Sequence, residues 1–446
     1  IIHEYGHSIQ DNQVPGFGKT NEGGAMGEGF GDYLAFSMSP ISQTGAYFAC
    51  IAEWDATSYA SGNPPCLRRL DSNKVYPTNI VNEVHADGEI IAGTLWDVRV
   101  AMIAALGPAA GVVKADDIYY AIIQRATDIP TSYAEALAAD DDDGNLANGT
   151  PNKCAIDRAF GPHGLVDGTN TFGVGLPVRD GAAVSLAVTA VGGCAAPELG
   201  NVALVWRRAG GADAGIPMVR TGDTWTANIP TQPDGTAVEY RVIATMASGA
   251  MLRFPDNPGD PYYRYYVGPL TPIYCTDFER DPFAAGWTHS ASSAVDDWQW
   301  STANGTTANG DPVTAASGDR LVGTDLRSDG LYPRNATETL LSPPIDTRGY
   351  TGVRLQFKRW LTVEDGFYDK ATIEADGAEV WRNFATNNPD ANTHSLDRAW
   401  KAEDLDVSAQ AADGTLRIGF KLQSDEGLQF GGWNVDDFCV LAAGVA

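Results

Sequence analysis

The first residues of the chain have the types and spacing that metal chemistry needs. Residues 3–7 read HEYGH, an HExxH pattern. Residues four apart lie on one face of a helix, so His3 and His7 can present two imidazoles to one ion. Zinc suits two neutral imidazoles plus a carboxylate and leaves a fourth position for water. Glu4 lies next to that water and is the predicted general base. Taken alone, the motif also fits a pair of surface histidines.

A second segment supplies the missing carboxylate. Residues 23–36 read GGAMGEGFGDYLAF and place Glu28 and Asp32 four apart on a predicted helix. Glu28 is the expected third ligand, and Asp32 can accept a hydrogen bond from the far nitrogen of a ligand histidine. The alternative makes both acids solvated helix residues. Glu22 is a rival ligand, but it precedes a Gly-Gly pair and is expected in a loop.

The elements that hold these residues are predicted to be helical from residue 1 to about 166. We expect a short helix over 26–37 after the Gly-Gly break, and a long apolar one over 84–106 that stops at Gly-Pro. A further helix is expected to begin near residue 116. A last one has its N-cap at 150 and stops at 164.

These motifs resemble the fungalysin family of secreted metallopeptidases and, more distantly, thermolysin, which are zinc peptidases of the gluzincin type. HEYGHSIQ followed by GGAMGEGFGDYLA carries the resemblance, which implies that Glu28 is the zinc ligand and Asp32 its supporting aspartate. EVHADGEIIAGTLWDV resembles the family helix whose histidine stabilises the transition state, which implies that role for His85. CLRRL resembles the segment whose arginine grips the substrate carbonyl, which implies Arg68.

Each implied role has a plainer alternative, and the chain departs from the family in places. His85 can serve merely as a cap at a helix start, and Arg68 can be an ordinary ion-pair residue. No tyrosine lies between Ser8 and Met26 to match the oxyanion tyrosine of thermolysin. No aspartate shortly precedes His85 to orient it, although Glu83 is close. The family's N-terminal lobe is absent, so we expect a fragment or processed product that binds peptides poorly by itself.

The fold class expected is multidomain. Residues 1–166 should form the mainly helical C-terminal lobe of a thermolysin-like peptidase. Short alternating runs over 170–268 predict an immunoglobulin- or fibronectin-like β-sandwich. Residues 272–446 predict a jelly-roll β-sandwich whose first and last strands both carry a cysteine.

The six cysteines predict disulfides in an oxidising compartment, because they are even in number, widely spaced and free of CxxC pairs. We pair Cys50 with Cys66, Cys154 with Cys194, and Cys275 with Cys439. Sequence alone does not determine this connectivity, and six buried free thiols are the alternative.

Composition excludes several classes of protein. The formal net charge of −27 repels nucleic acid and anionic lipid, so a nucleic-acid partner is excluded. No apolar run reaches the roughly 20 residues of a transmembrane helix. We expect a secreted protein with a protein or peptide substrate, and a surface glycan is a further candidate partner for the C-terminal domain.

Other polar and aromatic clusters are weaker signals. An acidic turn offers a candidate calcium site alongside the zinc, although a solvated turn explains it equally well. Its residues are Asp140, Asp141, Asp142, Asp143 and Asn145. The acid pairs at 296–297 and 436–437 are expected to cap turns. Trp287, Trp298 and Trp300 are expected in a core in preference to a sugar-stacking platform.

Two functions follow from these patterns. The first is a zinc-dependent endopeptidase that hydrolyses peptide bonds with a metal-activated water and Glu4 as base. The alternative is an inactive peptidase remnant that binds a cell surface or polysaccharide through its β domains.

Overall fold

The computed structural model describes residues 1–43, 45–58, 63–166, 173–191, 193–246, 251–292, 296–305, 310–387 and 393–445. The chain forms two compact units. Unit 1 comprises Ile1–Leu176 with Ala187–Glu198, and unit 2 comprises Pro177–Leu186 with Leu199–Ala446. The boundary expected between the helical and β segments falls on 167–172, outside the described residues.

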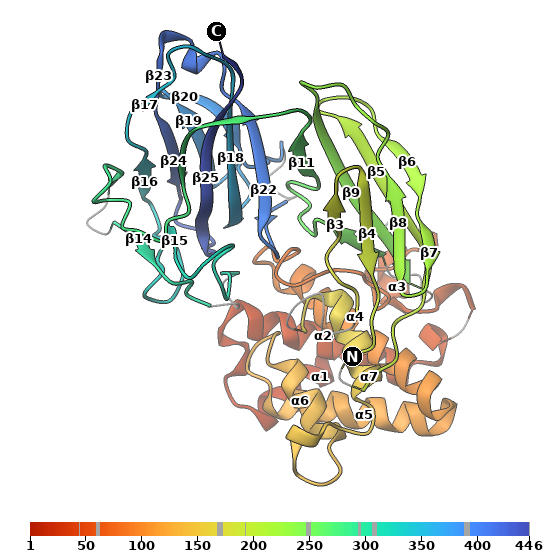
Figure 1. Ribbon diagram of the computed structural model, residues 1–446. Helices are drawn as coiled ribbons and strands as arrows, with labels where there is room; N and C mark the ends of the chain where they lie inside the picture. The colour runs from red at the N-terminus through yellow and green to blue at the C-terminus, as the bar shows by residue number, and fades with distance from the viewer. Residues whose placement is uncertain are drawn as a thin grey trace. The chain divides into compact units, whose positions relative to one another are not determined.

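Unit 1 is mainly helical (Figure 1). Its elements are α1 (Ile2–Gln13), η1 (Phe17–Lys19), α2 (Asn21–Met38), η2 (Pro40–Gln43), η3 (Gly45–Tyr47), β1 (Cys50–Ile51), α3 (Glu53–Ala56), β2 (Arg68–Arg69), α4 (Val84–Leu106), α5 (Pro108–Arg125), α6 (Ser132–Asp140), η4 (Leu146–Asn148), α7 (Lys153–Phe160) and η5 (Gly161–His163).

Helix α4 has the predicted bounds, but α2 begins before the Gly-Gly pair that was expected to break it. The hydroxyl of Thr20 caps α2 by accepting a hydrogen bond from the Gly23 amide at 3.0 Å. The prediction that Glu22 lies in a loop is therefore wrong, because Glu22 belongs to the first turn of α2. Burial against neighbouring helices outweighs the low helix propensity of glycine here.

Two further helix predictions need correction. Helix α5 begins at Pro108 instead of near residue 116, since proline suits the first position of a helix and the preceding Gly107 has a φ of +82°. Helix α6 was not predicted. The last helix is N-capped by Asn152 instead of residue 150.

Unit 2 contains antiparallel strands. They are β3 (Val178–Asp180), β4 (Ala183–Ala187), β5 (Leu199–Arg208), β6 (Ala214–Pro217), β7 (Val219–Thr221), β8 (Thr224–Asn228), β9 (Ala237–Met246), β10 (Met251–Phe254), β11 (Tyr263–Tyr266), β12 (Thr271–Thr276), β13 (Thr288–Ala291), β14 (Trp298–Ser301), β15 (Leu321–Thr324), β16 (Thr337–Leu341), β17 (Ile345–Asp346), β18 (Tyr350–Val363), β19 (Lys370–Ala375), β20 (Ala378–Arg382), β21 (Ser395–Leu396), β22 (Lys401–Asp406), β23 (Thr415–Leu416), β24 (Ile418–Gln423) and β25 (Gly432–Val445), with the short helix η7 (Gln410–Asp413).

The strands assemble into sheets that bury two hydrophobic faces against each other. One sheet has the order β14-β15-β25-β18-β21, with β12 on β25 and β22 on β18, and another has the order β13-β16-β24-β19-β20. Phe357 of β18 and Phe420 of β24 meet across the two sheets with ring centroids 5.1 Å apart. The earlier strands form the sheets β10-β9-β5-β6, with β11 on β9, and β3-β4-β8-β7. A β-sandwich region thus follows the helical unit, as expected (Figure 1). The predicted division of this region near residue 270 into two domains stays a prediction.

The cysteines are paired as predicted. Disulfides join Cys50 to Cys66, Cys154 to Cys194 and Cys275 to Cys439. The last pair faces across strands β12 and β25. Among the described residues, no helix combines the length and apolarity that a membrane span requires.

Candidate metal centre

Helices α1 and α2 bring the three predicted ligands together. The Nε2 atom of His3 lies 3.2 Å from Oε2 of Glu28, and Nε2 of His7 lies 3.5 Å from Oε1 of the same carboxylate. One ligand atom from each of the three residues lies within 4.8 Å of the others. Two imidazoles and a carboxylate are a donor set that zinc prefers. The residues present therefore fit the ion that the sequence implies.

Glycines let the two helices approach closely enough for this convergence. A Cβ atom on Gly31 of α2 would lie 2.7 Å from Nδ1 of His3, and one on Gly6 of α1 would lie 2.9 Å from the Cα of Gly31. On the opposite side, a Cβ on Gly29 would lie 2.6 Å from the carbonyl oxygen of Gly88 in α4. The GEGFGD segment therefore seats α2 between two helices. The spacing of these glycines in the sequence is a further signal of the close helix contact at this site.

Asp32 orients the first histidine. Its Oδ1 atom accepts a hydrogen bond from Nδ1 of His3 at 2.8 Å. With Nδ1–H donated to Asp32, Nε2 is the ring atom that faces Glu28 and is left to bind a metal once its own proton is lost. Burial lowers the pKa of His3, but hydrogen bonds to Asp32 and Glu28 outweigh it and raise that pKa to about 9. Burial raises the pKa of Glu28, yet the hydrogen bonds from His3 and His7 bring it below its usual range, so this carboxylate is ionised.

Arg68 contacts Asp32 through both ends of its guanidinium. Its Nε lies 2.6 Å from Oδ2 of Asp32, and its Nη2 donates to Oδ1 at 2.7 Å and lies 3.6 Å from Glu28. Burial lowers the pKa of Arg68, and the hydrogen bonds to Asp32 outweigh it and raise that pKa. The carbonyl-gripping role implied for Arg68 is a prediction, while its observed contact holds Asp32 in place.

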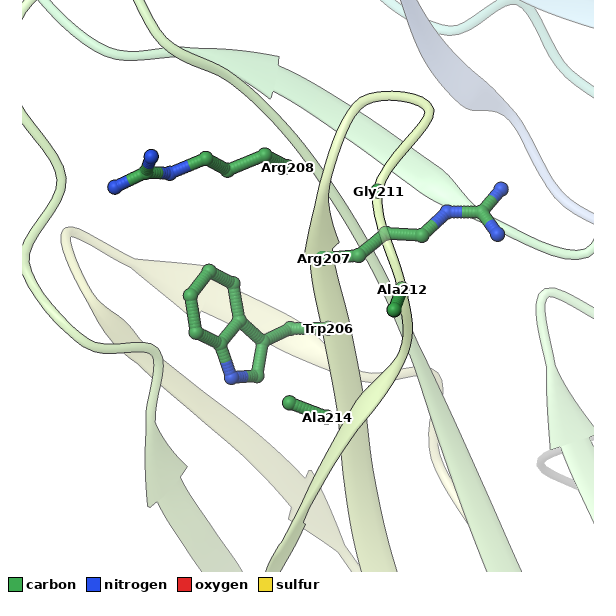
Figure 2. A pocket seen from close by; sticks show the side chains of 6 residues that line it. All are labelled: Trp206, Arg207, Arg208, Gly211, Ala212 and Ala214. Atoms are coloured by element: carbon green, nitrogen blue, oxygen red, sulfur yellow. The ribbon is translucent and has the colours of Figure 1, made fainter.

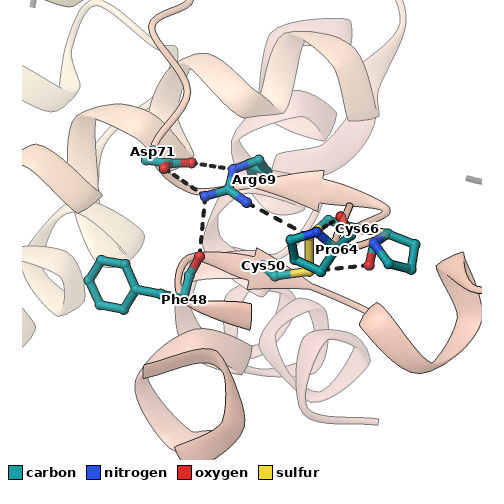
Figure 3. Close-up of a disulfide and its surroundings, with 7 residues drawn as sticks. Phe48, Cys50, Pro64, Cys66, Arg69 and Asp71 are labelled. Atoms are coloured by element: carbon teal, nitrogen blue, oxygen red, sulfur yellow. Dashed lines mark hydrogen bonds and ion pairs between the residues drawn. A yellow bond between two sulfur atoms is a disulfide. The ribbon is translucent and has the colours of Figure 1, made fainter. Parts of the chain in front are cut away.

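A two-strand hairpin aims Arg68 at this position. Strands β1 and β2 pair Ile51 with Arg68 and Cys50 with Arg69, and successive side chains of a strand point to opposite sides. Arg69 accordingly turns away and binds Asp71 at 2.7 Å beside the Cys50–Cys66 disulfide (Figure 3).

His85 lies at the edge of the ligand cluster, at the start of α4. Its Nε2 lies 3.4 Å from Oε2 of Glu28. Its Nδ1 lies 2.6 Å from Oε1 of Glu83, whose carboxylate also accepts hydrogen bonds from the backbone amides of His85 and Ala86. Glu83 therefore caps the helix and orients the imidazole, which is the task that no aspartate in the sequence was found to perform.

The remaining predicted residues of this region occupy different surroundings. Glu4 is exposed on α1, one residue from His3. Glu22 points elsewhere: its carboxylate accepts hydrogen bonds from the Tyr76 hydroxyl at 2.9 Å and from the Ile129 amide at 3.2 Å. Those bonds explain why Glu22 is not part of the ligand cluster.

The acidic turn after α6 divides into two parts. Asp140 is buried and binds the amide of Asn152 at 2.5 Å and the ammonium of Lys114 at 3.5 Å, so it holds the turn together. Asp141, Asp142 and Asp143 form an oxygen cluster. In that cluster Asp143 accepts a hydrogen bond from the amide of Asn145 at 2.9 Å. The calcium assignment there stays a prediction.

The tryptophans and Asp436 make structural contacts in the β region. Trp287 and Trp298 are buried in its core. The indole of Trp300 donates to the carbonyl of Phe278 at 2.6 Å. Asp436 accepts hydrogen bonds from two backbone amides, those of Ala316 and Ser317, as expected of a turn cap.

A pocket of about 310 Å³ lies at the ends of strands β5 and β6 and the turn between them (Figure 2). Its lining residues are Trp206, Arg207, Arg208, Gly211, Ala212 and Ala214. Arg207 is held by Glu239 at 2.6 Å and Arg208 by Gln232 at 2.8 Å.

Comparison with known families identifies the helical segment. Residues 1–168 match the fungalysin metallopeptidase (M36) family. This segment is fungalysin-like. The chain is 30% identical over 189 residues to extracellular metalloproteinase 5 of Trichophyton rubrum, which covers 37% of the chain and 29% of that protein. It is 28% identical over 190 residues to extracellular metalloproteinase mep of Aspergillus flavus, covering 38% and 30%.

A bacterial protein also matches part of this chain. Bacillopeptidase F of Bacillus subtilis is 32% identical over 216 residues, which cover 48% of the chain and 13% of that protein. The chain thus spans less than a third of the length of each of these relatives.

Solved structures add little to the family match. The K1 cleaved adhesin domain of Lys-gingipain from Porphyromonas gingivalis W83 aligns with 40% of the chain and all of that domain, at 16% identity and a TM-score of 0.26. A study of carbohydrate-binding modules of the β-sandwich superfamily supplies another match, with 59% and 93% coverage, 18% identity and a TM-score of 0.23.

Proposed function

We propose that the chain belongs to a secreted zinc endopeptidase and carries its metal-binding helices. One observation supports this most directly: one ligand atom each from His3, His7 and Glu28 converge within 4.8 Å. The fungalysin match, and the names of relatives called extracellular metalloproteinases, support the reaction class and the secretion. The helical unit would then be a thermolysin-like C-terminal lobe.

In this proposal His3, His7 and Glu28 hold the ion. Zinc, when bound, acidifies the attacking water and polarises the scissile carbonyl. Glu4 accepts the proton of that water and returns it to the leaving amine. Asp32 keeps the His3 proton on Nδ1, and Arg68 keeps Asp32 in position.

His85 stabilises the negative charge that develops on the carbonyl oxygen. Its Nε2 faces the ligand cluster and Glu83 holds its Nδ1. A donor placed in advance in this way contributes about 3 kcal/mol to transition-state stabilisation in other enzymes. Because the charge in this proposal develops on a peptide carbonyl, peptide or protein is the proposed substrate class.

The test is casein hydrolysis by the natural protein that contains this chain, with and without a chelator. Glu4→Gln should retain zinc and lose hydrolysis. Hydrolysis that survives zinc removal, or that survives Glu4→Gln, would contradict the proposal.

The alternative proposal is binding to a surface polymer through immunoglobulin-like and jelly-roll domains. The pocket at Trp206 favours it, because an aromatic ring on the same side of β5 as Arg208 suits a sugar or an acidic polymer (Figure 2). A pull-down on polysaccharides, with Trp206→Ala as the matched variant, tests it. Retention that is absent, or unchanged by the substitution, would remove this support.

A further inference from the structure

A cluster of three acids lies at one end of the β-sandwich, where two connections cross between sheets. The segment 364–369 leads from β18 in one sheet to β19 in the other, and the segment 424–431 leads back from β24 to β25. Strands β19 and β24 pair Lys370 with Gln423. The topology therefore places the start of β19 beside the end of β24, and it brings the two crossings together.

Three carboxylates lie between these crossings. Oxygen atoms of Glu364, Asp369 and Asp425 lie within 4.8 Å of one another. Glu364 and Asp369 are buried, with exposed fractions of 5% and 0%. Three carboxylates this close, two of them buried, repel one another when ionised unless a positive charge compensates them.

No basic side chain supplies that compensation within the described part of the chain. Among the ion pairs there, none involves Glu364, Asp369 or Asp425. Burial and the charges of Asp369, Asp425 and Asp365 raise the pKa of Glu364 to about 8.

The hydrogen bonds around the cluster leave one carboxylate oxygen, Oε2 of Glu364, without a donor among the described residues. Asp369 accepts from the Tyr332 hydroxyl at 2.7 Å and from the amide of Asp425 at 2.7 Å, and Asp425 accepts from the amide of Gly427 at 2.5 Å. Oε2 of Glu364 is buried and has no hydrogen-bond partner among the described residues. A Cβ atom built on Gly427 would lie 3.5 Å from this oxygen and 2.9 Å from Oδ1 of Asp425, so both acids lie beside the same backbone position.

Asp365, the neighbour of Glu364, shows the contrast. It is fully buried too, but its two oxygens accept hydrogen bonds from the backbone amides of Phe367, Thr386 and Thr393. A carboxylate satisfied in this way needs no cation. Glu364 differs because no donor reaches its Oε2.

We propose that Glu364, Asp369 and Asp425 bind a calcium ion that ties the two crossings together. Calcium takes six to eight oxygen ligands in flexible geometry, and the three acids would supply part of that shell, with water or backbone carbonyls completing it. Asn383 holds the backbone here, since its amide donates to the carbonyls of Glu364 and Asp369 at 3.0 Å each. The site is separate from the acidic turn at 141–143 and does not rest on the peptidase proposal.

The experiment is hydrogen exchange of the full chain in 5 mM calcium or in EGTA, with zinc present throughout. Calcium should slow amide exchange in 364–369 and 424–431 by about tenfold or more. Glu364→Gln and Asp425→Asn should abolish this protection. Asp142→Asn, in the other acidic cluster, should keep it.

Thermal unfolding gives a second measurement. In EGTA at pH 9, where Glu364 is ionised, Glu364→Gln should raise the Tm of the β region by a few degrees, because it removes a repelling charge, and in calcium at the same pH it should lower that Tm below wild type. Unchanged exchange in wild type, protection that persists in both variants, or a Tm increase in both buffers would overturn the calcium site.

Discussion

Replacing Asp32 by asparagine should have two effects: weaker zinc binding and a lower folding stability of unit 1. The carboxylate holds the Nδ1 proton of His3 at 2.8 Å and pairs with Arg68 at 2.6 and 2.7 Å. Removing a carboxylate that orients a ligand histidine typically costs 10- to 100-fold in metal affinity, or about 1.4–2.7 kcal/mol. The side chains of Asp32 and Arg68 are only 3% and 11% exposed, and Arg68 would keep only the Glu28 carboxylate, at 3.6 Å, so the loss of this ion pair should cost about 3 kcal/mol more in folding stability.

The assays are a competition titration with a fluorescent zinc chelator and urea unfolding of the zinc-free protein. Asp71→Asn is the matched control, because Asp71 binds the adjacent Arg69 with the same geometry on the surface, at 40% and 44% exposure. It should cost about 1 kcal/mol or less and leave zinc affinity unchanged. Equal zinc affinity in Asp32→Asn and Asp71→Asn would refute the assigned role of Asp32.

Three further predictions concern other parts of the molecule. Gly31→Ala should push His3 aside and lower zinc affinity by about tenfold, whereas Gly18→Ala, which meets nothing within 4 Å, should not change the same chelator titration. Glu83→Gln should keep the α4 cap and the zinc content but reduce kcat about tenfold in the casein assay, because it removes the negative charge that orients His85. A loss of zinc as large as the loss of kcat would contradict this. Burial and the charges of neighbouring aspartates raise the pKa of the Glu338 carboxyl to about 7 from an ordinary 4.5. The folded β region therefore binds this proton more tightly than the unfolded chain does. Its free energy of unfolding should fall by roughly 3 kcal/mol as the pH rises from 4.5 to 7. Calorimetry against pH should show that slope flattened in Glu338→Gln, and an unchanged slope would exclude this group as its cause.

The ligand set could be predicted because its signal is local. The spacing of His3 and His7 follows from helical periodicity, and the GEGFGD segment carries both Glu28 and its neighbour Asp32. The structure brings these four side chains together. The bounds of α4 were also predictable, since its apolar periodicity ends at a Gly-Pro stop.

Apart from the disulfides, most long-range contacts could not be predicted. Arg68 reaches Asp32 only because the β1–β2 hairpin aims it inward, and nothing in the local sequence indicates that direction. The Gly-Gly pair in α2 was interpreted as a break because tertiary packing, which overrides helix propensity there, is not visible in sequence. The acids at 364, 369 and 425 meet only through the crossing of two sheets, so no spacing rule selects them.

The most direct test of the central claim is anomalous diffraction at the zinc edge from crystals of this chain. The account predicts one strong peak bonded to Nε2 of His3, Nε2 of His7 and a carboxylate oxygen of Glu28, at about 2.0–2.2 Å from each. A peak that lies elsewhere, or a zinc ion that leaves Glu28 outside its coordination sphere, would contradict it.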